Sequence, residues 1–461
     1  MLTVTRLATD GEFSAVGNEW NALLRDSKQH DLLLTHEWFT MCRRWFCSEH
    51  ELYVLIVRQD GRLVGFAPLQ IRRVMRCGIT LRQLCFLHES LPWYRGDFVV
   101  ADESDQVLAA MLAYLSEHRQ DWDLARFEGV AEQSRTVAAL PRLGLPNGLS
   151  LGAWESFNQA SVMPIQREWE DFLHSCGVHF RKHLRNNENR LRRAGALEFH
   201  CTREPAEVDR QLRIVYSLQE DNHRHKQEQS PESDRVSAEA GLFLGKEFSR
   251  SGAAEVRLMT VDGKPVAGWF SVDLGRTSFA LVTKHNVQFA NHSPGMVMMR
   301  EYLRDTWRSG ADRIDCLMTW PYVQRWTSHA ERYLKIECFH GEPARGCCAA
   351  PACVRGCSAE RRPRKKPGYM TDSNPPIHAH PLPRLTKQAV RSALRPRLWP
   401  DRLPERTASI FREATPCGMR SKLSDWKPAA RCFFPPIIAG SNSTCCRLPA
   451  WAFHSMVWDG A

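Results

Sequence analysis

The chain has 461 residues, 43% of them hydrophobic and 25% charged, which is the composition of a globular protein large enough for two or three hydrophobic cores. Its formal charge of +10 comes from the end of the sequence: residues 347–461 hold 19 Lys and Arg against 7 Asp and Glu, which leaves 43 against 45 in residues 1–346. A near-neutral body argues against a nucleic-acid partner, because the usual footprint of such binding is a basic stripe on a folded face.

The sequence carries no targeting or membrane signal. No apolar run approaches the roughly 20 residues that cross a bilayer. The N-terminus, Met1-Leu2-Thr3-Val4, leads into a mixed polar stretch instead of the apolar segment of a secretory signal. We therefore expect a cytoplasmic protein without a transmembrane segment, and we interpret the eight cysteines before residue 340 as reduced thiols of the core.

Two predicted β-hairpins share the turn pair Asp-Gly. Residues 52–58 and 62–69 flank Asp60-Gly61, and residues 255–261 and 264–272 flank Asp262-Gly263. Asp-Gly between β-branched runs predicts a tight turn, because Gly accepts the positive φ that such turns require. The common order Asp-Gly-basic-x-Val favours two copies of one α/β domain. The alternative is that a common turn occurs twice by chance.

Helices and strands alternate around both hairpins. Apolar spacing predicts helices over residues 12–24, 106–115, 238–248 and 296–307. Strands are predicted over residues 123–129, 278–283 and 313–318. The fold class is therefore α/β (α+β). Residues 149–163 read as a loop between the two copies, so we divide the body into modules 1–155 and 156–341.

A basic helix is predicted over residues 180–193, where Phe180, Leu184 and Leu191 share one side. Arg181, Lys182 and Arg185 are candidate ligands for a phosphate or an acidic glycan, because guanidinium groups suit such anions. The alternative is an ordinary solvated helix face. The sequence alone does not decide between them.

The sequence changes character after about Gly341. Fifteen of the 26 prolines lie from Pro351 onward, and helical and strand periodicity is lost. We expect residues 342–461 to be a disordered basic tail rich in Pro, Arg and Cys, or the product of a shifted reading frame. Cysteines 347, 348, 353 and 357 lack the paired spacing of a zinc site, so no metal is expected.

The most favourable place for chemistry is the segment Ser293-Pro294-Gly295. Ser is a good N-cap and Pro suits the first helical position, so the triplet predicts the start of the helix over residues 296–307. Free backbone N–H groups at such a start attract anions, and Gly295 has no side chain to block them. The alternative is simply a well-formed helix start.

The following strand ends in polar and aromatic residues that we expect beside this helix start. Tyr322 is a candidate proton donor, Asp315 a candidate orienting carboxylate and Arg325 a candidate phosphate ligand. The alternative is a core Tyr with a surface Arg. Other reaction classes find no motif: the chain has no Gly-x-Ser-x-Gly elbow, no Walker loop and no His-Glu-x-x-His helix.

Six segments in this order resemble the CelD-like family of bacterial acetyltransferases, which is often found with cellulose or exopolysaccharide synthesis and belongs to the GNAT and FemAB-type acyltransferases. They lie between about residues 20 and 335, at residues 33–39, 61–69, 122–130, 180–185, 262–267 and 293–295. The resemblance implies tandem GNAT-like modules, in agreement with the repeated hairpin.

The resemblance also implies a function. The protein would transfer an acyl group from acetyl-CoA or another acyl-CoA to an amine or hydroxyl of a small-molecule or glycan acceptor, in contact with polysaccharide synthesis machinery. Ser293, Pro294 and Gly295 would bind the CoA pyrophosphate. The final motif carries over to Asp315, Tyr322, Arg325 and Trp326, with Trp326 at the substrate. Val323 stands near the Lys of family members.

Two other functions remain open. The first is a catalytically silent accessory protein of an exopolysaccharide system that binds glycan or nucleotide through the basic helix. The second is FemAB-like transfer from aminoacyl-tRNA, which the near-neutral body disfavours because phosphate neutralisation normally requires a basic groove.

Overall fold

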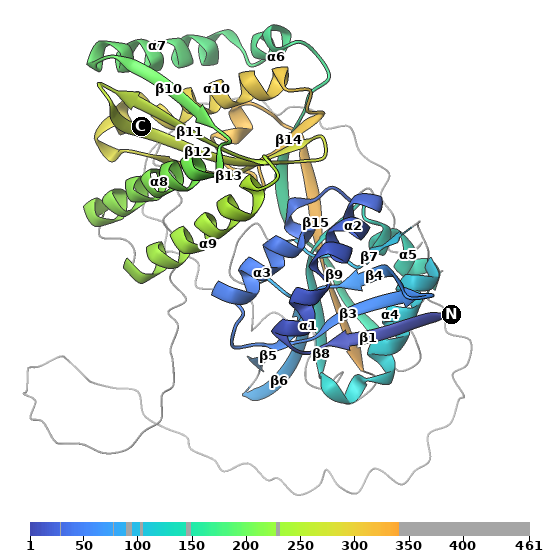
Figure 1. Ribbon diagram of the computed structural model, residues 1–461. Coiled ribbons are helices and arrows are strands. Elements are labelled where there is room, and N and C mark those ends of the chain that lie inside the picture. The colour runs from blue at the N-terminus through green and yellow to red at the C-terminus, as the bar shows by residue number, and fades with distance from the viewer. Residues whose placement is uncertain are drawn as a thin grey trace, which may run out of the picture. The chain divides into compact units, whose positions relative to one another are not determined.

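The computed structural model describes residues 1–340, except for residues 28, 77, 89–94, 102–104, 144–148 and 227–230. The predicted tail over residues 342–461, with its cysteines, lies outside the described residues. The described part is a mixed α/β structure in which helices flank β-sheets (Figure 1). The predicted fold class is confirmed.

The first half of the described chain begins with a strand, three α-helices and a hairpin. These are β1 (Leu2–Leu7), α1 (Asp10–Ala15), α2 (Gly17–Asp26), η1 (Leu32–Leu34), α3 (His36–Trp45), β2 (Glu51–Leu52), β3 (Val54–Gln59) and β4 (Arg62–Ala67). A second hairpin and further α/β elements follow: β5 (Leu69–Arg76), β6 (Ile79–Phe86), β7 (Val99–Val100), α4 (Asp105–Glu117), β8 (Leu124–Ala131) and α5 (Arg135–Leu143).

The second half repeats the opening order of strand, helices and hairpin. Its elements are β9 (Leu149–Pro164), α6 (Trp169–Ser175), α7 (Val178–Ala194), β10 (Leu197–Thr202), α8 (Pro205–Lys226), α9 (Pro231–Ser249), β11 (Ala254–Val261), β12 (Lys264–Leu274), β13 (Thr277–His285), η4 (Val287–His292), α10 (Pro294–Arg308), β14 (Arg313–Asp315), η5 (Val323–Arg325) and β15 (Ala330–His340). In both halves the strand before the helices pairs antiparallel with the first strand of the hairpin, β1 with β3 and β10 with β11.

Both Asp-Gly turns are formed as predicted. The two turn residues have positive φ in each case, with values of 51° and 85° at Asp60 and Gly61 and of 48° and 71° at Asp262 and Gly263. Positive φ at both central positions is the geometry of the tight turn that matches the twist of paired strands. Asp262 also accepts a hydrogen bond from the Ala196 amide at 2.8 Å, which ties the turn to the start of β10.

The described strands form two sheets. One, in the first half, has the order β1-β3-β4-β7, and the other spans both halves in the order β10-β11-β12-β13-β14-β9-β15-β8-β6-β5-β2. β9 pairs with β14 of the second half, whereas β15, the last described strand, lies between β9 and β8 of the first half. Residue 155, where we divide the chain, therefore lies inside β9, and the two modules remain a proposed division.

Three sequence predictions need correction. Residues 149–163 form most of β9 and are not a loop, because pairing with β15 and β14 outweighs the loop-forming Gly152 and Asn158. The helix predicted over residues 12–24 is two helices that meet at Val16. The strand predicted over residues 313–318 ends at Asp315.

Helices cover both faces of the strands β10 to β13. Figure 1 shows α8 and α9 on one face and α7 and α10 on the other. Apolar side chains of α8 and α9 share one core with the first half of the chain, and those of α7 and α10 form a second core with Met259 and Trp269. Five of the described cysteines are buried as predicted, whereas Cys201 is exposed on β10. Among the helices of the described residues, none is long and apolar enough to cross a membrane.

Candidate active site

β13 and β14 run side by side for only a short distance. Residues 277–279 pair in parallel with residues 313–315, and the described part of the chain shows no further pairing between the two strands, although β13 continues to His285. On its other side β13 carries a bulge: Phe270 pairs with Val282 and Ser271 pairs with Ala280, so that Leu281 is an extra residue. Among the described strands none pairs with this edge of β13 over its second half, which leads through η4 into α10.

The start of α10 has the features of an anion site. Pro294 is the first helical residue, as predicted, and the first turn carries no acidic side chain that would offset the helix dipole. Ser293 differs from the prediction: its φ of 45° is left-handed, because it also ends η4, and its side chain makes no capping hydrogen bond. Pro294 has no N–H and the Met296 amide donates to the Ser293 carbonyl at 3.0 Å, so the Gly295 amide is the donor of this turn that an anion would find.

An unsatisfied polar atom lies next to this helix start. Nδ1 of His292, the residue directly before Ser293, is buried and has no hydrogen-bond partner among the described residues. A buried polar atom without a partner is costly and often indicates a missing water, ion or ligand. His292 is therefore a candidate ligand-contacting residue beside the α10 start, and the sequence prediction did not include it.

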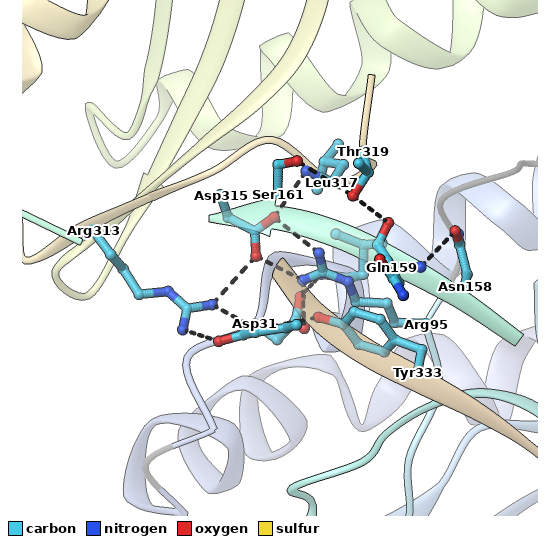
Figure 2. Close-up of polar contacts among 12 residues, drawn as sticks. Asp31, Arg95, Asn158, Gln159, Ser161, Arg313, Asp315, Leu317, Thr319 and Tyr333 are labelled. Carbon is cyan, nitrogen blue, oxygen red and sulfur yellow. Dashed lines mark hydrogen bonds and ion pairs between the residues drawn. The ribbon is translucent and has the colours of Figure 1, made fainter. Parts of the chain in front are cut away.

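Asp315 lies at the end of β14 inside a network of charged groups (Figure 2). Its carboxylate is fully buried and accepts two hydrogen bonds from the Arg95 guanidinium, at 2.8 and 2.9 Å. Arg313 lies 3.3 Å away, and the Leu317 amide donates to Oδ1 at 2.8 Å. Burial alone would raise the pKa of Asp315, but the charge of Arg95 more than offsets it and holds this pKa below its usual value. Asp315 is thus ionised and fully committed to protein partners.

Tyr322, Arg325 and Trp326 lie in and around η5. Tyr322 is partly buried against the core that contains Met296 of α10, and burial raises its pKa well above the usual value for tyrosine. Arg325 is exposed. Trp326 is buried, and its ring lies 4.9 Å from that of Phe180 in an edge-on contact. The surroundings of Trp326 are those of a core side chain.

The basic helix forms as predicted, as α7, and it runs antiparallel to α10. Glu188 in the middle of α7 pairs with Arg300 at 2.8 Å, whereas Phe172 of the preceding α6 stacks on Trp307 at the end of α10. Arg181 donates to the His174 carbonyl at 2.7 Å, and Lys182 and Arg185 are exposed. These three residues lie toward the end of α10 away from Ser293. The structure therefore does not bring them to the α10 start.

The sequence prediction also missed Lys284 on the second half of β13, beyond the residues that pair with β14. Lys284 pairs across the sheet with Gly268, which packs under Val215 of α8, so the lysine lies on the face that α8 and α9 cover. Burial lowers the pKa of Lys284 to about 8, although the nearby charge of Asp234 acts in the opposite direction. No pattern in the sequence indicates Lys284, because the bulge at Leu281 that lies near it can be recognised only once the pairing of β12 with β13 is known.

Part of the sequence matches a known protein family, and the structure is similar to solved structures. Residues 178–325, from α7 to η5, match the family described as an acetyltransferase (GNAT) domain. The solved structure of FemX is similar, with a TM-score of 0.50 and 14% identity over 74% of this chain and 99% of FemX. A tandem GNAT protein from the clavulanic acid biosynthesis pathway has a TM-score of 0.37 and 13% identity over 73% of this chain and 98% of that protein. No curated protein matches the sequence.

These findings agree with the predicted resemblance to GNAT and FemAB-type acyltransferases. The fold is similar to that of FemX over nearly all of that protein, and it agrees with the predicted α/β class with tandem GNAT-like modules. Residues 178–325, about a third of the chain, match the acetyltransferase (GNAT) domain family, and this match supports an acyltransferase. The finer resemblance to the CelD-like family stays a prediction.

Proposed function

We propose that this protein transfers an acyl group from acetyl-CoA or another acyl-CoA to an amine or hydroxyl acceptor. The observation that carries the proposal is the start of α10, where the unpaired edge of β13, a helix N-terminus without acidic residues and the unsatisfied Nδ1 of His292 adjoin along the chain. Ser293, Pro294 and Gly295 would hold the pyrophosphate of the donor. Acyl-CoA supplies the thioester that is broken.

The residues around this donor site suggest how the proton moves. The acceptor attacks the thioester carbonyl, the carbon–sulfur bond breaks, and the departing thiolate needs a proton. Tyr322 stays protonated at neutral pH because burial raises its pKa, so it suits a donor and not a base. On the other face of the sheet, which α8 and α9 cover, Lys284 has a pKa of about 8, is deprotonated in a fraction of molecules at neutral pH, and would accept the proton from an acceptor bound on that face. Positioning of the thioester supplies much of the remaining rate.

The remaining predicted residues take less direct roles in this proposal. Both carboxylate oxygens of Asp315 are engaged by protein groups, so Asp315 would hold the neighbouring backbone and charged side chains in place and would not touch the substrate. Arg325 is exposed, and it is free to contact a donor phosphate. Lys182 and Arg185 on α7 present positive charge to solvent, which suits an acidic glycan and favours an acceptor from polysaccharide synthesis.

Calorimetric titration of the full chain with acetyl-CoA tests the donor site. We expect binding that Gly295→Phe weakens at least tenfold, because the bulky side chain would cover the N–H groups of the first turn. Ser309→Phe is the control, since it adds the same bulk at the exposed opposite end of α10. Absence of acetyl-CoA binding by the folded wild type would exclude the proposal.

Release of the CoA thiol with a panel of amine and glycan acceptors tests the chemistry. Tyr322→Phe should lower turnover on the order of a hundredfold without changing acetyl-CoA affinity. Lys284→Met should remove the rise in rate that the wild type shows through about pH 8. A protein that binds acetyl-CoA and releases no thiol with any acceptor would instead fit the catalytically silent accessory alternative.

A further inference from the structure

The charged network around Asp315 connects the two halves of the chain. Arg95 lies in the first half, yet it pairs with Asp315, 220 residues later. Its guanidinium also contacts Asp31 at 3.0 Å and lies over the Tyr333 ring at 4.6 Å from the centroid. The arginine side chain is almost fully buried, so nearly all of its partners are protein groups (Figure 2). A buried two-point contact of this kind fixes geometry more strictly than a single ion pair.

Arg95 is itself held firmly by the first half of the chain. The next residue, Gly96, donates to the Gly129 carbonyl at 3.3 Å. A Cβ atom at Gly96 would lie 2.4 Å from ring carbons of Phe86, so the backbone packs directly on that ring. Asp31 also has a second contact, because its Oδ1 accepts from the Leu33 amide at 2.9 Å. The guanidinium is therefore presented from a rigid support.

On the other side of the network, Asp315 holds a strained turn. The carboxylate oxygen that accepts from Arg95 Nη2 also accepts from the Leu317 amide. Leu317 has a φ of 61°, a left-handed conformation that is strained for a leucine. Such strain persists only where the surroundings impose it. The turn directs the chain away from β13, just beyond the last residues that β14 pairs with it.

We propose that Arg95 is a positioning residue for the acyl donor: it holds Asp315, which holds the turn at Leu317 and so sets where β14 separates from β13. The inference rests on the proposed donor site beside that edge. It predicts that the first half of the chain controls donor binding in the second half without touching the donor. Loss of Arg95 should loosen the part of the site that receives the thioester arm, and leave the phosphate contacts at α10 in place.

The test compares two ligands on full-chain variants. Arg95→Met removes the contact, and Arg95→Lys keeps the charge but not the two-point geometry. Calorimetry should show acetyl-CoA affinity reduced about tenfold in both, a size typical of coupling between contacting groups. Affinity for 3′,5′-ADP, which lacks the thioester arm, should change less than twofold. Arg257→Met is the control, because Arg257 is similarly buried and pairs only within the second half, with Glu255 and Asp305.

The outcomes separate this inference from the donor site itself. Wild-type binding of acetyl-CoA with unchanged affinity in both folded Arg95 variants would overturn the role of Arg95 and leave the donor site standing. An equal loss for acetyl-CoA and 3′,5′-ADP would also overturn it, since general destabilisation acts on both ligands. If Arg95→Met does not fold, Arg95→Lys decides. A wild type that binds no acetyl-CoA overturns the donor site, and the inference with it.

Discussion

Asp97 provides a test of the loop that carries Arg95. Its side chain is 5% exposed, and it accepts a hydrogen bond from the Phe98 amide at 2.8 Å. Burial raises the pKa of Asp97 to about 6, and the charge of Asp31 acts in the same direction. Hydrogen bonds from Thr136, Phe98 and Ser134 lower this pKa but do not offset the burial. The fold therefore carries a carboxylate that is costly to ionise.

The sign of the pH effect follows from this pKa. A carboxyl group whose pKa is higher in the folded than in the unfolded chain binds more protons when folded, so stability falls as pH rises between the two values. The shift from 3.8 to about 6 corresponds to about 3 kcal/mol at most. The contribution is fully favourable below about pH 4 and is lost by about pH 6 to 7. Asp97→Asn removes the titration and keeps an oxygen acceptor for the Phe98 amide.

Urea unfolding between pH 4 and pH 7.5 measures this effect. The stability of Asp97→Asn relative to the wild type should increase with pH by up to about 3 kcal/mol over this range. Asp60→Asn is the control, because that carboxylate is exposed and Asn also tolerates the left-handed turn. A difference that stays constant with pH, or that decreases, would refute the reasoning.

Two substitutions test packing around the site. Trp326→Ala should cost about 3–5 kcal/mol of unfolding free energy, because the side chain is buried against Phe180; unchanged urea stability would return Trp326 to a substrate role. Gly96→Ala should cost about 1–3 kcal/mol, because the new methyl group meets the Phe86 ring. Its control, Gly11→Ala, has no atom within 4 Å and should be neutral or stabilising, and equal stability of the two variants would show that the loop at Gly96 yields.

Local signals predicted the elements that depend on local chemistry. The sequence predicted both Asp-Gly turns, the basic helix α7 and the start of α10 at Pro294. These features depend on residues that are close together in the chain. The length of β14 was not predicted, because Asp315 ends the strand through a hydrogen bond to Leu317 that no periodicity reveals.

Long-range pairing explains what the sequence could not predict. β9 contains Gly, Ser and Asn residues that favour loops, and it becomes a strand because β15, more than 160 residues later, pairs along it. The partner of Asp315 was likewise hidden, since Arg95 lies 220 residues away. The sequence therefore drew attention to Asp315, but not to the arginine that holds it, and the donor segment stays a prediction.

β15 is the last described strand and pairs with both β8 and β9, so the sheet can be completed only late in synthesis. The edge of β8 in the first half finds its partner only when residues 330–340 have left the ribosome, after every other described element. Until then β8 and β9 present open strand edges, which are prone to pair with other chains. A fragment limited to residues 178–325 would lack both β9 and β15, leaving the outer edge of β14 uncovered. We therefore expect a chain truncated at either boundary of the matched domain to aggregate and not to fold into a functional half.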